Sequence, residues 1–112
     1  MKIYHNPRCR KSRETLTLIE EAGVEPEIIL YLENPPTARE LKAILSKLGI
    51  PAEQLVRKSE AIYKEKYKGK KLTEAQWIKA MIAHPKLIER PIVVEGKKAV
   101  LGRPPEQVNE LL

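Results

Sequence analysis

Residues 2–32 have the sequence KIYHNPRCRKSRETLTLIEEAGVEPEIILYL, in which a strand pattern, a helix pattern and a second strand pattern follow one another. Polar and apolar residues alternate from Lys2 to His5, which predicts a short strand. From Arg10 to Ala22 the apolar positions have helical spacing, and Gly23 is a natural terminator for that helix. Glu27 to Leu32 contains a continuous apolar run, which predicts a strand covered on both faces. A strand, helix and strand within about thirty residues form a βαβ unit, which requires a parallel pair of strands and a right-handed crossover.

The rest of the chain predicts helices first and a strand pair last. Thr37 stands three residues before Glu40, and Thr73 stands three residues before Gln76, so both positions are typical starts of capped helices. A shorter helix is expected from Ser59. Residues 91–101 predict two antiparallel strands joined by a tight turn, and a last helix follows them. The order βαβ, helices, ββα predicts an α/β thioredoxin-like fold, with one domain over residues 1–112 and a helical insertion at about residues 37–84.

Composition excludes several classes of protein. The chain has 112 residues, which is room for one domain, and all 15 of its acidic residues are glutamates. It has one cysteine, Cys9, and two histidines, His5 and His84. A lone cysteine cannot form an internal disulfide, so a disulfide-stapled secreted scaffold is excluded. Without aspartate, an aspartate-based triad, calcium loop or two-metal site is excluded as well, and we expect neither a metal site nor a bound cofactor.

Charge and hydropathy indicate the compartment and the partner. No stretch approaches the ~20 apolar residues of a membrane span, and no apolar signal segment is visible at the N-terminus. A single unpaired thiol is typical of a reducing environment, so we expect a cytoplasmic protein without a membrane partner. The formal charge of +6 indicates an anionic partner. The basic run from Lys64 to Lys71 has Tyr67 as its only aromatic residue, which favours a solvent-exposed loop over a nucleic-acid site.

Cys9 lies between the first predicted strand and the first predicted helix. A thiol there faces unpaired backbone N–H groups and the positive end of the helix dipole, both of which stabilise a thiolate. The dipole contributes about 0.3–1 kcal/mol, whereas an ordinary thiol needs roughly 2.7 kcal/mol to become mainly ionised at neutral pH. Nearby cations or charge-assisted hydrogen bonds must supply the difference, and the hydroxyl of Ser12 can donate to the sulfur. A buried structural cysteine is the alternative, but the polar and cationic neighbours favour a reactive thiol.

The segment His5-Asn6-Pro7-x-Cys9-x-x-Ser12-Arg13 closely resembles the active-site loop of glutaredoxin-coupled arsenate reductases, the ArsC family. The resemblance continues through residues 30–36, 55–58, 84–94 and 102–104, in the same order as in that family. It implies a thioredoxin-like fold with a helical insertion, and it implies arsenate reductase activity. The chain looks most like the short arsenate-reductase-like branch, because Arg10-Lys11 stands where arsenate reductases of this group usually have Gly-Thr.

The resemblance also implies roles for individual residues. Cys9 is expected to attack arsenate. Three arginines are expected to bind the oxyanion, namely Arg57, Arg90 and Arg103. Four residues are expected to support the site, namely His5, Asn6, Ser12 and Pro91. Pro91 matches the position at which thioredoxin-like folds have a cis-proline beside the thiol. Glutathione is the implied reductant, and glutaredoxin is the implied protein partner.

Some alternatives stay open at this point. His5 either donates toward the thiolate, orders Asn6, or is a strand-end residue with a satisfied backbone contact. A second possibility for the whole protein is a thiol oxidoreductase of this type that acts on another substrate. A third is a non-enzymatic transcription regulator of the same fold family, but those regulators use a Cys-x-x-Cys redox switch, and here Ser12 replaces the second cysteine.

Overall fold

The computed structural model describes all 112 residues and contains one four-stranded sheet together with α-helices and short 3₁₀ helices. Its elements in chain order are β1 (Lys2–Tyr4), α1 (Arg10–Glu21), β2 (Glu27–Ile29), α2 (Ala38–Leu48), α3 (Ala52–Leu55), α4 (Ala61–Lys66), α5 (Glu74–Ala83), the 3₁₀ helix η1 (Pro85–Leu87), β3 (Ile92–Glu95), β4 (Lys98–Leu101) and the 3₁₀ helix η2 (Pro105–Leu111). The chain divides into two compact units, one of residues 1–34 with 90–112 and one of residues 35–89. None of the helices combines the length and the apolar character that crossing a membrane requires.

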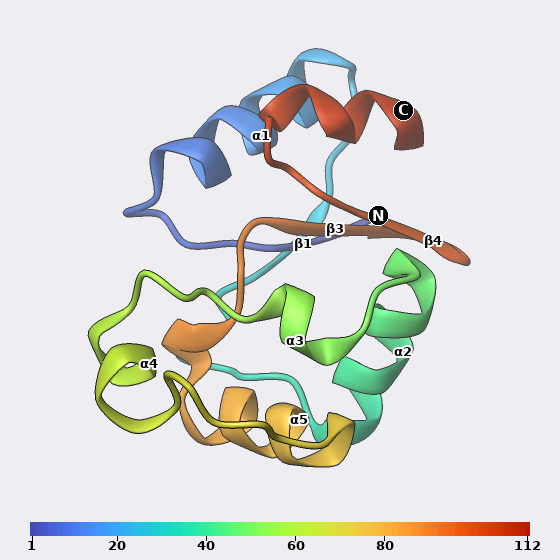
Figure 1. Cartoon of the computed structure of the whole chain (residues 1–112). Helices are drawn as coiled ribbons and strands as arrows, with labels where there is room; N and C mark the ends of the chain where they lie inside the picture. The colour runs from blue at the N-terminus through green and yellow to red at the C-terminus, as the bar shows by residue number, and fades with distance from the viewer. The chain divides into compact units, whose positions relative to one another are not determined.

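The first unit contains all four strands, in the order β2-β1-β3-β4. β1 is parallel to β2 and antiparallel to β3, and β4 is antiparallel to β3. α1 and η2 lie on the same face of this sheet (Figure 1). There Ile19 of α1 and Val108 of η2 pack with Ile3 and Val93 of the sheet, and all four side chains are fully buried. This βαβ unit followed by a ββα unit confirms the predicted α/β thioredoxin-like fold.

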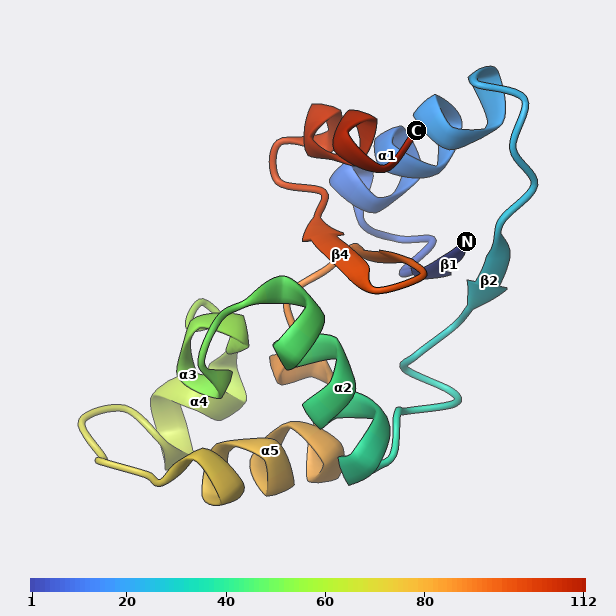
Figure 2. The same cartoon turned by 90° about the vertical axis from the view of Figure 1, so that its right-hand side faces the viewer.

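The second unit consists of helices, and both predicted capping boxes are present in it. The Thr37 side chain accepts a hydrogen bond from the Glu40 N–H, and the Glu40 carboxylate accepts one from the Thr37 N–H. Thr73 and Gln76 make the same reciprocal pair at the start of α5. α2 lies beside α5 in this unit (Figure 2). The single-domain organisation with an insertion at about residues 37–84 stays a prediction.

The prediction for residues 27–32 is wrong in two respects. β2 ends at Ile29 rather than at Leu32, because the Leu30 carbonyl accepts hydrogen bonds from the N–H groups of Glu33 and Asn34 and closes a turn. β2 is also an edge strand with β1 as its only neighbour. Ile28 is therefore 46% exposed, and the strand is not covered on both faces.

The short helix α3 has no counterpart in the sequence-based prediction. Its first N–H group, that of Ala52, donates to both carboxylate oxygens of Glu74, at 3.0 and 3.1 Å. This cap comes from a residue 22 positions later in the chain. A local sequence pattern cannot contain such a signal, because only the folded chain brings Glu74 to the start of α3.

Candidate active site

The loop between β1 and α1 is shaped by Asn6, which is buried. The carbonyl oxygen of Asn6 accepts a hydrogen bond from the Cys9 N–H, and its side-chain oxygen accepts one from the Arg8 N–H, both at 3.0 Å. Arg13, one turn into the helix, donates from Nη1 to the carbonyl oxygen of Pro7 at 3.0 Å. These bonds hold both ends of the loop, so Cys9 is fixed as the residue that precedes the first turn of α1.

The surroundings of Cys9 stabilise its thiolate. Burial of Cys9 by itself raises the pKa of the thiol. The backbone N–H of Ser12, the hydrogen bond and positive charge of Arg90, and the backbone N–H of Lys11 lower that pKa and together outweigh burial. The pKa of Cys9 therefore lies below its ordinary value. Cys9 forms no disulfide, and the residue is partly exposed.

Ser12 contributes to this arrangement in a way that the sequence did not predict. Its hydroxyl oxygen lies 2.6 Å from Nδ1 of His5 and accepts a hydrogen bond from the Asn6 N–H at 3.1 Å. The predicted donation from this hydroxyl to the sulfur is replaced by these two bonds, and the backbone N–H of Ser12 is the group that stabilises the thiolate. Ser12 is completely buried, and its hydroxyl joins the loop to the end of β1.

His5 belongs to the same buried network. Its backbone N–H donates to the carbonyl oxygen of Ile29 at 2.8 Å, which is the strand-end contact, while its ring contacts Ser12. Burial is the main cause that lowers the pKa of His5, the positive charge of Arg13 adds to it, and Glu20 opposes it. A neutral imidazole is therefore favoured near neutral pH, and its side-chain hydrogen bond is with Ser12 rather than with the thiol.

Arg90 and Arg103 come to neighbouring places because β3 and β4 pair. Ile92 lies opposite Leu101 in this ladder, so the residues just before β3 face the residues just after β4. The Gly102 N–H donates to the carbonyl oxygen of Pro91 at 2.9 Å and continues the pairing by one step. The Arg90-Pro91 peptide bond is cis, as predicted, and the Arg103-Pro104 bond is cis as well.

Gly102 is a residue that the sequence analysis missed as part of the site. A β-carbon at this position would lie 2.7 Å from Cγ of Pro91 and would overlap the side chain of Thr15 in α1. Thr15 is fully buried, and its hydroxyl donates to the carbonyl oxygen of Lys11 at 2.8 Å. Glycine therefore allows the end of β4 to approach α1 closely, directly before Arg103.

Arg57 lies in the second unit, in the segment between α3 and α4. The Arg57 N–H donates to the carbonyl oxygen of Leu87 at 2.6 Å. Its guanidinium is paired with Glu60 and Glu89, two residues that the sequence analysis did not single out. Of the three predicted anion-binding arginines, Arg90 and Arg103 share the unit that contains Cys9, and Arg57 belongs to the other.

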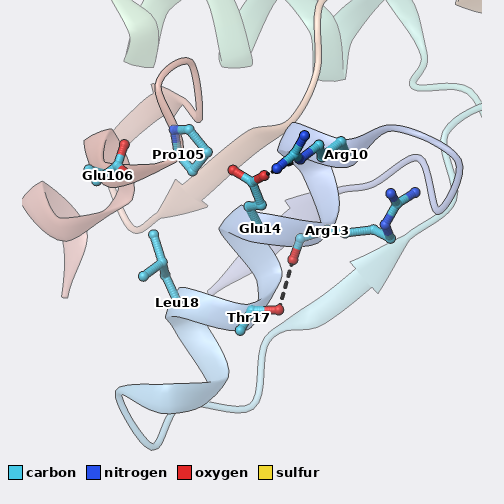
Figure 3. Close-up of a pocket in the computed structure, with 7 residues that line it drawn as sticks. All are labelled: Arg10, Arg13, Glu14, Thr17, Leu18, Pro105 and Glu106. Atoms are coloured by element: carbon cyan, nitrogen blue, oxygen red, sulfur yellow. Dashed lines mark hydrogen bonds and ion pairs between the residues drawn. The ribbon is translucent and has the colours of Figure 1, made fainter.

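A polar groove of about 490 Å³ runs between α1 and η2 (Figure 3). It begins at Arg10, the residue after Cys9, and includes Glu14, Leu18 and Pro105. Nε of Arg10 is paired with the Glu14 carboxylate at 2.8 Å, one turn further along α1. Cys9 does not line this groove, which therefore differs from the predicted oxyanion site.

The chain is similar to known proteins over nearly its whole length. An Escherichia coli K12 protein with the name "Uncharacterized protein YfgD" is 54% identical over 114 residues, covering 100% of this chain and 96% of that protein. The arsenate reductase of Haemophilus influenzae is 48% identical over 112 residues, covering 98% of this chain and 97% of that protein. The structure of the arsenate reductase from Vibrio cholerae superimposes with a TM-score of 0.95 at 50% identity, covering 99% of this chain and 96% of that one. The family model for the ArsC family matches residues 4–111. This chain therefore belongs to the ArsC family.

Proposed function

We propose that this protein reduces arsenate to arsenite, with the Cys9 thiolate as the nucleophile. The observation that carries the proposal is the position of Cys9 before α1, where two backbone N–H groups and Arg90 lower the pKa of its thiol. A thiolate attacks far better than a thiol, so this cysteine has the ionisation state that the reaction needs. The similarity to arsenate reductases of Haemophilus influenzae and Vibrio cholerae supports arsenate as the substrate.

The proposed oxyanion ligands are Arg57, Arg90 and Arg103. An anionic nucleophile approaches an anionic substrate only where cations offset their repulsion. Planar guanidinium groups suit this purpose, because they donate two parallel hydrogen bonds to two oxygens of a tetrahedral anion. Arg90 supports this assignment most directly, because the same guanidinium that would bind the oxyanion also stabilises the thiolate.

The proposed reaction begins with attack of the Cys9 sulfur on arsenic, which forms an S–As bond and expels one arsenate oxygen as water after protonation. A glutathione thiol then adds to the same arsenic and expels a second water. A glutaredoxin thiolate attacks the glutathione sulfur and forms a disulfide with it. The bond between the glutathione sulfur and arsenic breaks in this step, and its electron pair stays on arsenic, which is reduced from the +5 to the +3 state. Water finally releases arsenite and returns the Cys9 thiol.

External thiols are part of the proposal because Cys9 is the only cysteine of the chain. The two electrons that reduce arsenic come from two sulfurs that end as a disulfide, and a single cysteine cannot provide both. We assign these roles to glutathione and to glutaredoxin, and we assign the reaction to the cytoplasm, where both thiols are kept reduced.

The decisive experiment measures arsenite formation by the purified protein with arsenate, glutathione and glutaredoxin. Cys9→Ser should abolish arsenite formation, and alanine variants of Arg57, Arg90 and Arg103 should each reduce kcat/KM by at least about tenfold. Arg39→Ala, on the exposed side of α2, is the matched control and should behave as the wild type. Full activity in Cys9→Ser would refute the proposal.

A second measurement tests the anion site without turnover. Sulfate resembles arsenate in shape and charge, and it should raise the pKa of the Cys9 thiol because it offsets the arginine charges. The thiol can be titrated by its absorbance as thiolate or by its alkylation rate, with and without sulfate. An unchanged titration would contradict the assigned site.

A further inference from the structure

The groove between α1 and η2 combines charges of both signs with an apolar lining. Its charged residues include Arg10 and Glu14 of α1 and Glu106 of η2 (Figure 3). Its apolar lining comes from Leu18, which packs against the hydrophobic core, and from Pro105, which is buried. All of these residues belong to the first unit, so the groove is complete within that unit.

Arg10 and Glu14 form an ion pair along α1. Nε of Arg10 donates to Oε1 of Glu14 at 2.8 Å, between residues one helical turn apart. The Arg10 side chain is 85% exposed and that of Glu14 is 46% exposed, so both charges can also contact a ligand. The second arginine of the groove, Arg13, already donates from Nη1 to the carbonyl oxygen of Pro7. Arg10 is therefore the cation that the groove offers to an anionic group.

The end of the groove that contains Arg10 and Glu14 lies close to Cys9. Arg10 follows Cys9 directly, so their Cα atoms are about 3.8 Å apart. A helix rises about 1.5 Å per residue, which places Glu14 roughly 7 Å along α1 from Cys9. The groove can thus hold one end of a thiol compound whose sulfur reacts at Cys9.

The three charged groups together favour a zwitterion over a simple anion. One guanidinium and two carboxylates leave the groove with an excess of negative charge, which opposes an oxyanion such as arsenate. Glutathione has a γ-glutamyl end that carries an ammonium and a carboxylate on the same carbon. The chain from that carbon to the thiol sulfur is about 8 Å long when extended. It therefore matches the spacing between Glu14 and Cys9, and its methylene groups suit the apolar lining.

We propose that the groove between α1 and η2 binds the γ-glutamyl end of glutathione. Arg10 binds its carboxylate, because a guanidinium donates well to carboxylate oxygens. Glu14 and Glu106 bind its ammonium group. This assignment rests on the role of glutathione in the proposed function, and it separates the site of the reductant from the site of the oxyanion.

The test uses a reaction of Cys9 that requires neither arsenate nor glutaredoxin. The Cys9 thiolate attacks one sulfur of oxidised glutathione, forms a mixed disulfide with that half and releases the other half as a thiolate. Mass spectrometry follows the rate through the mass that the protein gains. The reference reagent is the disulfide of cysteinylglycine, which lacks the γ-glutamyl end. The ratio of the two rates, the glutathione preference, cancels any change in the reactivity of the thiol itself.

Removal of an acidic charge distinguishes a binding site from general attraction. Glu106→Gln makes the protein more positive, so general attraction would raise the rate with oxidised glutathione, which is an anion. The proposed site predicts the opposite, a fall in the glutathione preference by about threefold, because the ammonium group loses a charged partner. The matched control is Glu110→Gln, at an exposed position of η2 that does not line the groove. It should leave the preference unchanged.

Removal of the basic charge tests the carboxylate contact. Arg10→Gln should lower the glutathione preference by about three- to fivefold, the size of effect expected for an exposed charge pair. The matched control is Arg8→Gln, which removes the same charge on the other side of Cys9 in the chain, at a residue that does not line the groove. It should change the preference by no more than about 1.5-fold, because salt screens exposed charges.

A titration with S-methylglutathione, followed by nuclear magnetic resonance, locates the ligand without any reaction at Cys9. It should shift the backbone amide signals of the residues that line the groove, and the shifts should be weaker in Arg10→Gln. The proposed site is overturned if Glu106→Gln keeps or raises the glutathione preference, if Arg8→Gln lowers it as much as Arg10→Gln, or if the groove signals do not shift. A wild type that shows the preference but forms no arsenite would contradict the proposed function and leave the groove assignment intact.

Discussion

The buried hydroxyl of Ser12 supports the active loop, and its removal should destabilise the protein strongly. Ser12→Ala leaves two buried partners without a hydrogen bond from this side chain, the Asn6 N–H at 3.1 Å and Nδ1 of His5 at 2.6 Å. His5 is 6% exposed and Asn6 is 8% exposed, so water cannot easily replace the hydroxyl. Each unsatisfied buried group costs about 1–3 kcal/mol. We therefore expect the free energy of unfolding to fall by about 2–4 kcal/mol.

Urea unfolding followed by circular dichroism measures this loss. The matched control is Thr17→Ala in the same helix, where an exposed hydroxyl donates to the carbonyl oxygen of Arg13 at 3.0 Å. Because water can replace that bond, the control should change the free energy of unfolding by no more than about 0.5 kcal/mol. A loss in Ser12→Ala as small as in the control would refute the reasoning.

The same variant distinguishes the effect of the Ser12 hydroxyl on the thiol from the effect of the Ser12 backbone N–H. Alanine keeps the N–H at position 12, and this N–H is the group that stabilises the Cys9 thiolate. The rate at which iodoacetamide alkylates the folded variant at neutral pH should therefore fall only modestly. If alkylation stopped while stability was unchanged, the hydroxyl would act on the sulfur directly, which would contradict its assignment to His5 and Asn6.

Three further predictions concern other parts of the first unit. Gly102→Ala should lower the free energy of unfolding by about 1–3 kcal/mol, because its β-carbon would overlap Thr15; an unchanged thermal midpoint would contradict this close approach. The pKa of His5 is lowered in the folded state, chiefly by burial, so the unfolded chain binds the proton more readily. Stability should consequently decrease as the pH falls below about 6.5, and this decrease should end once the pH is below the lowered pKa of folded His5. In urea titrations at different pH values, His5→Gln should lack this part of the pH dependence. Arg90→Gln should slow alkylation of Cys9 at neutral pH, because it removes the charge that stabilises the thiolate; an equal or faster rate would argue against that contact.

The sequence predicted correctly those helix ends whose hydrogen bonds join residues only a few positions apart. Both capping boxes involve residues three positions apart, so Thr37 with Glu40 and Thr73 with Gln76 are recognisable without any tertiary information. The end of α1 is another such case. Gly23 adopts a positive φ of 82°, and its N–H donates to the carbonyl oxygen of Glu20 at 2.9 Å.

Features that depend on residues far apart in the chain were predicted wrongly or were not predicted at all. The apolar run that starts at Ile28 is typical of a strand buried on both faces, but the position of β2 in the sheet leaves Ile28 half exposed. The start of α3 depends on the carboxylate of Glu74, which no pattern around Ala52 contains. The carboxylates around Arg57 were missed for the same reason, because Glu89 reaches it from 32 residues away.

The sequence by itself determined the order of most of the elements and the single thiol at the start of the first helix. Each of these follows from composition or from neighbours within a few residues. Only the tertiary structure decided how the thiol and the arginines are held, because burial and hydrogen bonding depend on groups that the fold brings together. It assigned the Ser12 hydroxyl to His5 and Asn6 rather than to the sulfur. It also set the register of the predicted pair of strands, with Ile92 of β3 opposite Leu101 of β4, and this register brings Arg90 and Arg103 to neighbouring places.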